Sequence, residues 1–214
     1  MTGASGALYG VRLVQIMAEM GLSVELIVSD PARLVIREEI ETIRSVIIQK
    51  GDGFKSLSSF LDCFAGPRPP HNDKAIDFPN LKFYSPKDFT AAVASGSYPT
   101  AGMVILPCSM GTLGAIANGL SQNLIHRAAD CMIKEGRKLV LVPRETPLSA
   151  IHLENMLKLA RLGVAIVPAM PGFYSAAASL QEMVDFMVGK VLDQLGISHA
   201  LYPRWTGPHA GALA

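Results

Sequence analysis

The sequence predicts an α/β fold of the Rossmann-like, three-layer kind, in which helices cover both faces of a mostly parallel sheet. Two observations predict this class. Short apolar segments, typical of buried strands, alternate along the chain with longer segments whose apolar residues recur every three or four positions. Loops rich in small and hydroxyl residues follow several of the short segments, where open α/β sheets bind ligands.

Five segments have the length and apolar content of buried strands. They are residues 24–28, 81–84, 103–106, 139–142 and 164–167. Six other segments show the apolar spacing of helices, and glycine or proline bounds most of them. They are residues 7–20, 32–48, the residues directly after 112, and residues 124–135, 151–162 and 180–195. The alternation of strands with helices implies parallel strand pairing.

The chain is interpreted as a single α/β domain over residues 1–214, with a C-terminal tail. Glycine and proline interrupt residues 50–100, which we interpret as a variable segment of that domain. A glycine-rich turn begins at Thr2, directly after Met1, although such turns normally follow a buried strand. The first strand of the sheet is therefore expected to be missing from this chain, which we expect to be truncated or to start further upstream.

Composition excludes several classes of protein. Nineteen basic and 18 acidic residues give a net charge of +1, so no footprint for nucleic acid is present. No apolar run approaches the length of a membrane helix. The three cysteines, at positions 63, 108 and 131, lack CxxC spacing, which favours reduced thiols in the cytoplasm over a disulfide or a metal site. Half of the residues are hydrophobic, which is consistent with a core and a subunit interface.

Four loops are candidates for a ligand site at the carboxyl ends of the strands: residues 3–6, 29–31, 107–112 and 143–147. The first is a glycine-rich turn that opens a helix, so its backbone N–H groups and the helix dipole favour an anion. In the last, Arg144 can bind a phosphate or a flavin carbonyl, and Glu145 can move a proton. Taken alone, a glycine loop of this kind is more often only a turn, and an isolated arginine–glutamate pair is more often a solvated ion pair.

Basic and aromatic side chains elsewhere add weaker signals. Arg127 and Lys134 lie seven positions apart on one helix face, which suits a phosphate or a solvated surface. Tyr174 and Trp205 can form an aromatic wall, or they can pack in a core.

Several motifs in order resemble the UbiX-type flavin prenyltransferases, formerly described as aromatic acid decarboxylases. The matching segments are Thr-Gly-Ala-Ser-Gly-Ala at 2–7, Pro-Cys-Ser-Met-Gly-Thr at 107–112, Asn-Leu-Ile-His-Arg-Ala-Ala-Asp at 123–130, Leu-Val-Pro-Arg-Glu-Thr-Pro-Leu at 141–148, Ile-His-Leu-Glu-Asn-Met at 151–156, Pro-Gly-Phe-Tyr at 171–174 and Pro-Arg-Trp at 203–205. The resemblance covers nearly the whole chain and is loosest over residues 50–100.

The resemblance implies an enzyme that joins a dimethylallyl group from dimethylallyl phosphate to N5 and C6 of reduced FMN, without a metal. The family passes the prenylated FMN to a separate UbiD-type decarboxylase, in aromatic acid decarboxylation and ubiquinone biosynthesis. It also implies a homo-oligomer, expected to be a dodecamer, with sites at subunit junctions. Whether the donor is the monophosphate or the diphosphate stays open.

The resemblance also assigns roles to individual residues. Those around FMN are Gly3, Ala4, Ser5, Ser29, Ser109, Met110, Gly111, Thr112 and Arg144. Those at the prenyl phosphate or prenyl pocket are Tyr174, Lys190, Arg127, Lys134 and Trp205. Those expected to take part in catalysis are Ser5, Glu145, Glu39, Lys134 and Arg127.

Two other functions are compatible with parts of the pattern. The first is an FMN-dependent decarboxylase of the cysteine-decarboxylase fold, but that group has a Pro-Ala-Met-Asn stretch, and here Pro168-Ala169-Met170 continues to Pro171. The second is a flavin carrier without catalysis, which would not need Glu145, Lys190 and Tyr174 together.

Overall fold

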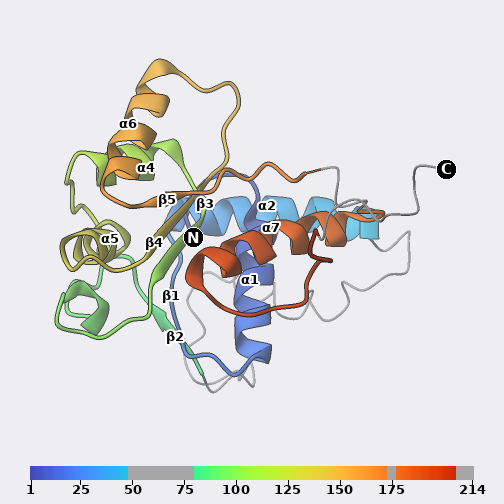
Figure 1. The fold of residues 1–214 in the computed structure, drawn as a ribbon, viewed down its shortest axis with the longest axis horizontal. Coiled ribbons are helices and arrows are strands. Elements are labelled where there is room, and N and C mark those ends of the chain that lie inside the picture. Colours follow the sequence, from blue (N-terminus) through green and yellow to red (C-terminus); the bar gives the residue numbers. More distant parts are fainter. Residues whose placement is uncertain (48–79, 173–176, 206–214) are drawn as a thin grey trace.

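The computed structural model describes residues 1–47, 80–172 and 177–205 (Figure 1). Its helices are α1 (Ala7–Glu19), α2 (Asp30–Ile47), η1 (a 3-10 turn, Ala92–Ala94), α4 (Met110–Ala117), α5 (Leu124–Lys134), α6 (Ala150–Arg161) and α7 (Leu180–Leu195). Its strands are β1 (Val24–Ile27), β2 (Leu81–Tyr84), β3 (Met103–Cys108), β4 (Leu139–Pro143) and β5 (Ala165–Ile166).

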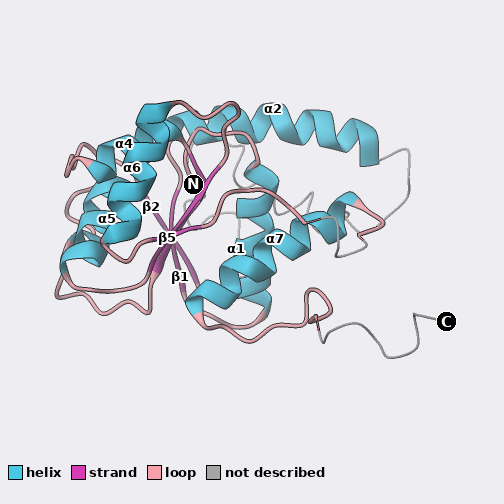
Figure 2. Ribbon diagram, turned by 45° about the horizontal axis from the view of Figure 1, so that its top comes forward, coloured by secondary structure: helices cyan, strands magenta, loops and turns pink. Residues whose placement is uncertain are grey.

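All strand pairs among the described residues are parallel, as predicted. Strand β1 pairs with β2, and β3, β4 and β5 pair in that order. Residues along β4 alternate between two cores: Val140 and Val142 face one cluster, and Leu139 and Leu141 face the other. Helices therefore cover both faces, with α1 and α7 on one side and α4, α5 and α6 on the other (Figure 2). The predicted fold class is confirmed.

The sheet is interrupted between β1 and β3, and only Met1 and Thr2 bridge the gap. The Met1 amino group donates to the Ile27 carbonyl (2.8 Å), and the Ser29 N–H donates to the Met1 carbonyl (3.1 Å). On the other side, the Thr2 N–H donates to the Pro107 carbonyl (3.1 Å). These bonds place Met1 and Thr2 in the position of a strand between the two edges.

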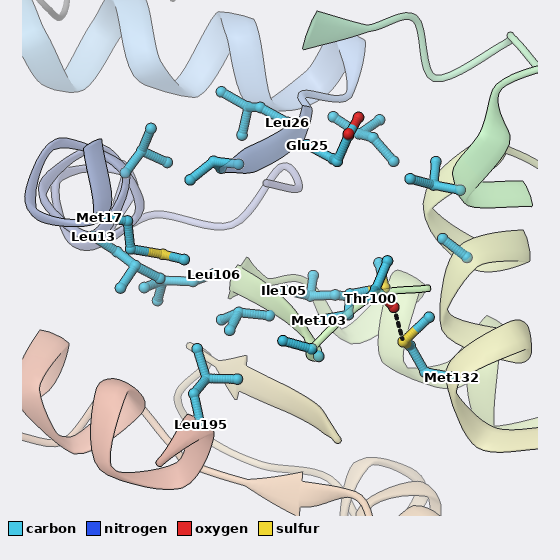
Figure 3. A pocket seen from close by; sticks show the side chains of 18 of the residues that line it. Leu13, Met17, Glu25, Leu26, Thr100, Met103, Ile105, Leu106, Met132 and Leu195 are labelled. Atoms are coloured by element: carbon cyan, nitrogen blue, oxygen red, sulfur yellow. Dashed lines mark hydrogen bonds between the residues drawn. The ribbon is translucent and has the colours of Figure 1, made fainter. Parts of the chain in front are cut away.

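Below this bridge lies a cavity of about 440 Å³ between the facing edges of β1 and β3 (Figure 3). Apolar side chains from α1 and both strands line it, including Leu13, Leu26 and Ile105. Glu25 is the one charged side chain among the described residues that line it. Its Oε1 accepts from the Tyr98 hydroxyl (2.8 Å), and its buried Oε2 accepts no hydrogen bond from the described residues.

Some boundaries differ from those expected. Helix α4 begins at Met110, inside the segment predicted to be a loop, because the Ser109 side chain caps it. Strand β3 continues to Cys108 rather than ending at 106, and α2 begins at Asp30 rather than at 32. Within the variable segment, Ala92–Ala94 forms an unpredicted helical turn.

None of the helices in the described ranges combines the length and the apolar character that crossing a bilayer requires.

Candidate active site

The first three predicted loops meet at one edge of the sheet. The Thr2 hydroxyl donates to the Pro107 carbonyl (2.9 Å) and accepts from the Ser109 N–H (2.8 Å). Gly3 lies so close to Pro31 that an added Cβ would stand 2.6 Å from the Pro31 Cβ. A side chain at position 3 would therefore push the turn away from its neighbour. Ser29 approaches the same point, through its N–H bond to the first residue of the chain.

Strand pairing adds the fourth loop. Cys108 of β3 is in register with Pro143 of β4, which brings Arg144 next to Ser109 at the carboxyl ends of the two strands. The Ala169 N–H donates to the Pro143 carbonyl (3.0 Å), so the chain after β5 joins the same edge. The structure thus gathers the four predicted loops, as expected for a parallel sheet.

The Glu39 carboxylate caps the N-terminus of α1. Glu39 of α2 accepts from the Gly6 N–H through Oε1 and from the Ala7 N–H through Oε2, both at 2.8 Å. Gly6 adopts a φ of 98°, which favours glycine. The prediction that this turn offers free N–H groups to an external anion is therefore wrong for Gly6 and Ala7. Burial, and then the Glu39 charge, raise the pKa of Tyr9.

The N-terminus of α4 is differently arranged. Ser109 caps it, because its hydroxyl accepts from the Thr112 N–H (3.3 Å) and contacts the Thr112 hydroxyl (3.1 Å). Met110 and Gly111 form the first turn, where N–H groups have no partner within the helix. A Cβ added at Gly111 would meet nothing within 4 Å, so this turn faces open space. The open N-terminus at this edge therefore belongs to α4.

Arg144 supplies the second feature that suits a ligand. Its side chain is half-buried, and its Nε is buried without a hydrogen-bond partner among the described residues. A buried, unpaired guanidinium N–H is costly, by about 1–3 kcal/mol, so a ligand that accepts from it would be stabilised. The neighbouring Glu145 is exposed, and its Oε1 accepts from the Thr146 N–H (3.1 Å). Ser5 is also exposed.

The predicted phosphate-binding residues on α5 lie elsewhere in the subunit. Arg127 donates through Nε to the Ala94 carbonyl (3.0 Å) and pairs with Asp130 (2.9 Å). Lys134 pairs with Glu135. None of the hydrogen bonds and ion pairs that these two side chains make within the described ranges involves the four loops.

The remaining predicted residues lie on and after α7. The Lys190 ammonium lies over the rings of Phe186 (5.7 Å) and Tyr202 (5.6 Å). Trp205 is 75% exposed. Tyr174 lies outside the described residues, so its placement stays a prediction.

Sequence reasoning missed the role of Thr2, which ties the first and third loops together. Its partners stand more than a hundred positions away along the chain, and no local spacing indicates such a contact. Cys108 and Cys131 are buried free thiols, and burial raises the pKa of Cys108 to about 12. The described residues contain no cluster of three potential metal ligands.

The fold and the edge site define an α/β protein that is built to bind an anionic cofactor at the carboxyl ends of its strands. A model of the Flavoprotein family matches residues 1–192. A flavin prenyltransferase UbiX from Halalkalibacterium halodurans is 48% identical over 205 residues, which cover 96% of this chain and 90% of that protein. The chain therefore belongs to the Flavoprotein family and, within it, to the UbiX-type flavin prenyltransferases.

Two solved structures are similar throughout. AnUbiX (PadA1), in complex with FMN and dimethylallyl pyrophosphate, has a TM-score of 0.77 and 35% identity, and the match covers 98% of this chain and 96% of that one. A dodecameric FMN-dependent UbiX-like decarboxylase from Escherichia coli O157:H7 has a TM-score of 0.75 and 39% identity, with coverage of 97% and 100%.

Proposed function

We propose that this protein joins a dimethylallyl group to N5 and C6 of reduced FMN, with dimethylallyl phosphate as the donor. The observation that carries the proposal is the buried, unpaired Nε of Arg144 at the edge where α4 begins. A guanidinium beside an open helix N-terminus suits a ligand with a phosphate and carbonyl acceptors. The similarity to AnUbiX, which was solved with FMN and dimethylallyl pyrophosphate, supports the same pair of ligands.

The four loops would hold the flavin. The open first turn of α4 and Arg144 provide donors to an anionic or carbonyl group, and the small residues of the neighbouring loops leave room for a planar ring. The residues proposed for this contact are Gly3, Ala4, Ser5, Ser29, Ser109, Met110, Gly111, Thr112 and Arg144. When bound, reduced FMN supplies a nucleophilic N5, and the chain binds, orients and shields it.

Departure of the phosphate requires cations, because negative charge builds up on the leaving oxygen. Arg127, Lys134 and Lys190 are the proposed cations, and the contacts described for them within one subunit are to groups outside the four loops. We propose that neighbouring subunits of a homo-oligomer supply some of them, so that the site forms at a subunit junction. The dodecameric relative from Escherichia coli supports this arrangement.

The bonds that form and break in the reaction indicate which side chains near the loops would transfer protons. The allylic C–O bond breaks and C1 of the allyl group bonds to N5, which loses its proton. The remaining double bond takes up a proton at C2, C3 bonds to C6, and C6 releases its proton. Glu145 is proposed to accept that proton, with Glu39 and Ser5 beside the reacting groups. Tyr174 and Trp205 are proposed to exclude water, which would otherwise capture an allylic cation.

The destination of the product belongs to the same proposal. We propose that prenylated FMN passes to a UbiD-type decarboxylase, and that both proteins act in the cytoplasm. Adding a purified UbiD-type apoenzyme to the reaction mixture and measuring its decarboxylation activity would test the transfer.

The direct test is anaerobic incubation with reduced FMN and dimethylallyl phosphate, followed by mass spectrometry of the released flavin. We expect a mass gain of one five-carbon unit. Unchanged flavin with both donors, the monophosphate and the diphosphate, would refute the transferase and favour a flavin carrier. Carbon dioxide from a peptidyl or aromatic acid, without a second enzyme, would instead favour a decarboxylase.

Variants test the residues. Arg144→Ala is expected to weaken FMN binding about tenfold or more, because it removes a charged donor. Arg161→Ala is the matched control, since Arg161 is an exposed arginine at the end of α6. Equal losses in both variants would show that general charge, and not the site, binds FMN.

Mixing of inactive variants tests the subunit junction. If Arg144 and Lys190 act in one site from different subunits, mixed oligomers of Arg144→Ala and Lys190→Ala recover part of the activity. Mixed oligomers of Arg144→Ala and Glu145→Gln are not expected to recover, because both changes affect the same loop. Recovery in neither mixture would contradict a shared site.

A further inference from the structure

The C-terminal segment, residues 199–205, is fastened to the end of α7 by one carboxylate, that of Asp193. Its Oδ1 accepts from His199 Nε2 (3.1 Å) and Arg204 Nη2 (2.7 Å). Its Oδ2 accepts from the Tyr202 hydroxyl (2.5 Å) and Arg204 Nη1 (2.7 Å). The arginine pair is bidentate, the geometry that gives the strongest charge-assisted hydrogen bonds.

The bonding pattern leaves little freedom at this point. The His199 side chain is 2% exposed, and its Nδ1 accepts from the Leu201 N–H (3.2 Å). Nδ1 is therefore the bare nitrogen, and Nε2 carries the hydrogen that is donated to Asp193. Hydrogen bonds from Arg204, and then from Tyr202, hold the pKa of Asp193 well below its usual range. The carboxylate thus stays charged at neutral pH.

The segment also builds the surroundings of Lys190. The Tyr202 ring packs at 5.0 Å from the Phe186 ring, and the Lys190 ammonium lies over both. A Cβ added at Gly189 would stand 2.4 Å from the Tyr202 ring, so only glycine allows this approach. Arg204 lies 5.0 Å from the same ring and precedes the exposed indole of Trp205. The segment fastened by Asp193 thus supplies the ring beneath Lys190 and leads directly into Trp205.

We propose that Asp193 is a positioning residue for the prenyl-phosphate site. By fixing Tyr202 and Arg204, it holds the ring beneath the Lys190 ammonium and sets the place of Trp205. This inference rests on the proposed function, because Lys190 and Trp205 act on dimethylallyl phosphate only in that reaction. Asp193 itself does not touch the donor.

The test compares Asp193→Asn with Asp185→Asn. Asp185 is also on α7 and also makes a bidentate pair, with Arg12 at 2.7 and 3.1 Å, but none of the bonds described for the C-terminal segment involves it. For Asp193→Asn we expect KM for dimethylallyl phosphate to rise about tenfold, with the FMN dissociation constant unchanged. For Asp185→Asn, KM is expected to stay within twofold.

A second readout does not depend on activity. Trp205 is the only tryptophan, so its fluorescence anisotropy reports the mobility of the segment. Asp193→Asn is expected to lower the anisotropy, and Asp185→Asn to leave it unchanged. Asp193→Glu keeps the charge and is expected to restore part of both readouts. Arg204→Gln, at an exposed position, repeats the test should Asp193→Asn fail to fold.

Unchanged anisotropy and KM in Asp193→Asn and Arg204→Gln would overturn the proposal. An equal rise of KM in Asp185→Asn would also overturn it, since the effect would then come from a weakened helix. If the unmodified protein forms no prenylated flavin, the proposed function fails, and the anisotropy alone decides whether Asp193 fastens the segment.

Discussion

In a protein produced to start at Met1 with a free amino group, acidification from pH 8 to pH 5 is expected to lower the free energy of unfolding through that amino group. That group is buried between β1 and β3, where it donates to the Ile27 carbonyl. Burial lowers its pKa from 8.0 to about 5, and the nearby Cys108 opposes the shift to a smaller extent. The folded protein therefore favours the neutral amine, and the unfolded chain favours the ammonium.

The sign and the size follow from proton linkage. Between pH 5 and pH 8 the unfolded chain binds a proton that the folded protein does not, so the free energy of unfolding rises with pH. The difference between 8.0 and about 5 corresponds to about 4 kcal/mol over the whole range. The amine is inside the protein, so solvent does not screen this effect. A change of this size is a large part of the stability of an ordinary domain.

Urea unfolding at several pH values measures the effect. Intact mass spectrometry first establishes that Met1 is retained, and the matched control is the same chain with an acetylated amino terminus, which cannot take up the proton. Burial also lowers the pKa of His126, which titrates in the same direction, but both chains contain it, so the difference between them belongs to the amino group. The reasoning is refuted if the free and acetylated chains lose the same stability between pH 8 and pH 5.

Three further changes test the neighbourhood of the start of the chain. A short apolar, β-forming extension fused before Met1 is expected to pair with β1 and β3, fill the cavity and raise the free energy of unfolding by about 2–5 kcal/mol, whereas a glycine–serine extension of equal length would not. Thr2→Val removes the hydroxyl that joins two loops and is expected to lower the free energy of unfolding in urea by about 1–3 kcal/mol. Thr146→Val, at an exposed position, is the control. An equal loss of stability in both variants would contradict the role of the Thr2 hydroxyl. The Cβ of Gly3→Ala would stand 2.6 Å from the Pro31 Cβ, so this variant is expected to lower the free energy of unfolding by about 1–3 kcal/mol, and the melting temperature with it. Gly111→Ala, whose Cβ meets nothing within 4 Å, is expected to leave both unchanged. Equal melting temperatures of the two variants would contradict the packing argument.

Most of the fold could be predicted because each element carries its own pattern. The apolar run at 139–142 predicted a buried strand, and β4 places alternate residues of that run in the two cores. The spacing of Leu180, Val184, Val188 and Val191 predicted α7, and the last three of these are buried. Boundaries were less predictable where a cap decides them, as Ser109 does for α4.

The site could be predicted only in part, because contacts between distant segments complete it. Parallel pairing predicted that the loops after β3 and β4 lie at the same edge of the sheet, and the pairing of β3 with β4 makes Ser109 and Arg144 neighbours there. The bonds of Glu39 to the N-terminus of α1 depend on how α2 packs, which periodicity does not specify. The placement of Arg127 depends on partners that no spacing indicates, such as the Ala94 carbonyl.

The N-termini of α1 and α4 lie at this edge, and among the described contacts a carboxylate of the protein occupies only the first of them. This difference bears on where the flavin phosphate would bind in the proposed reaction. Glu39 neutralises the dipole of α1 with a carboxylate of the protein, so a second anion at Gly6 would meet a negative charge. The turn at Gly111 opens to free space with no such carboxylate among its described contacts, so we propose α4 as the position of the flavin phosphate. Ser5, exposed beside Gly6, is then left free of phosphate binding and available to the reacting end of the flavin. We therefore propose that the Ser109 turn, rather than the glycine-rich turn, is the anion site, and that the glycine-rich turn lies beside the reacting groups.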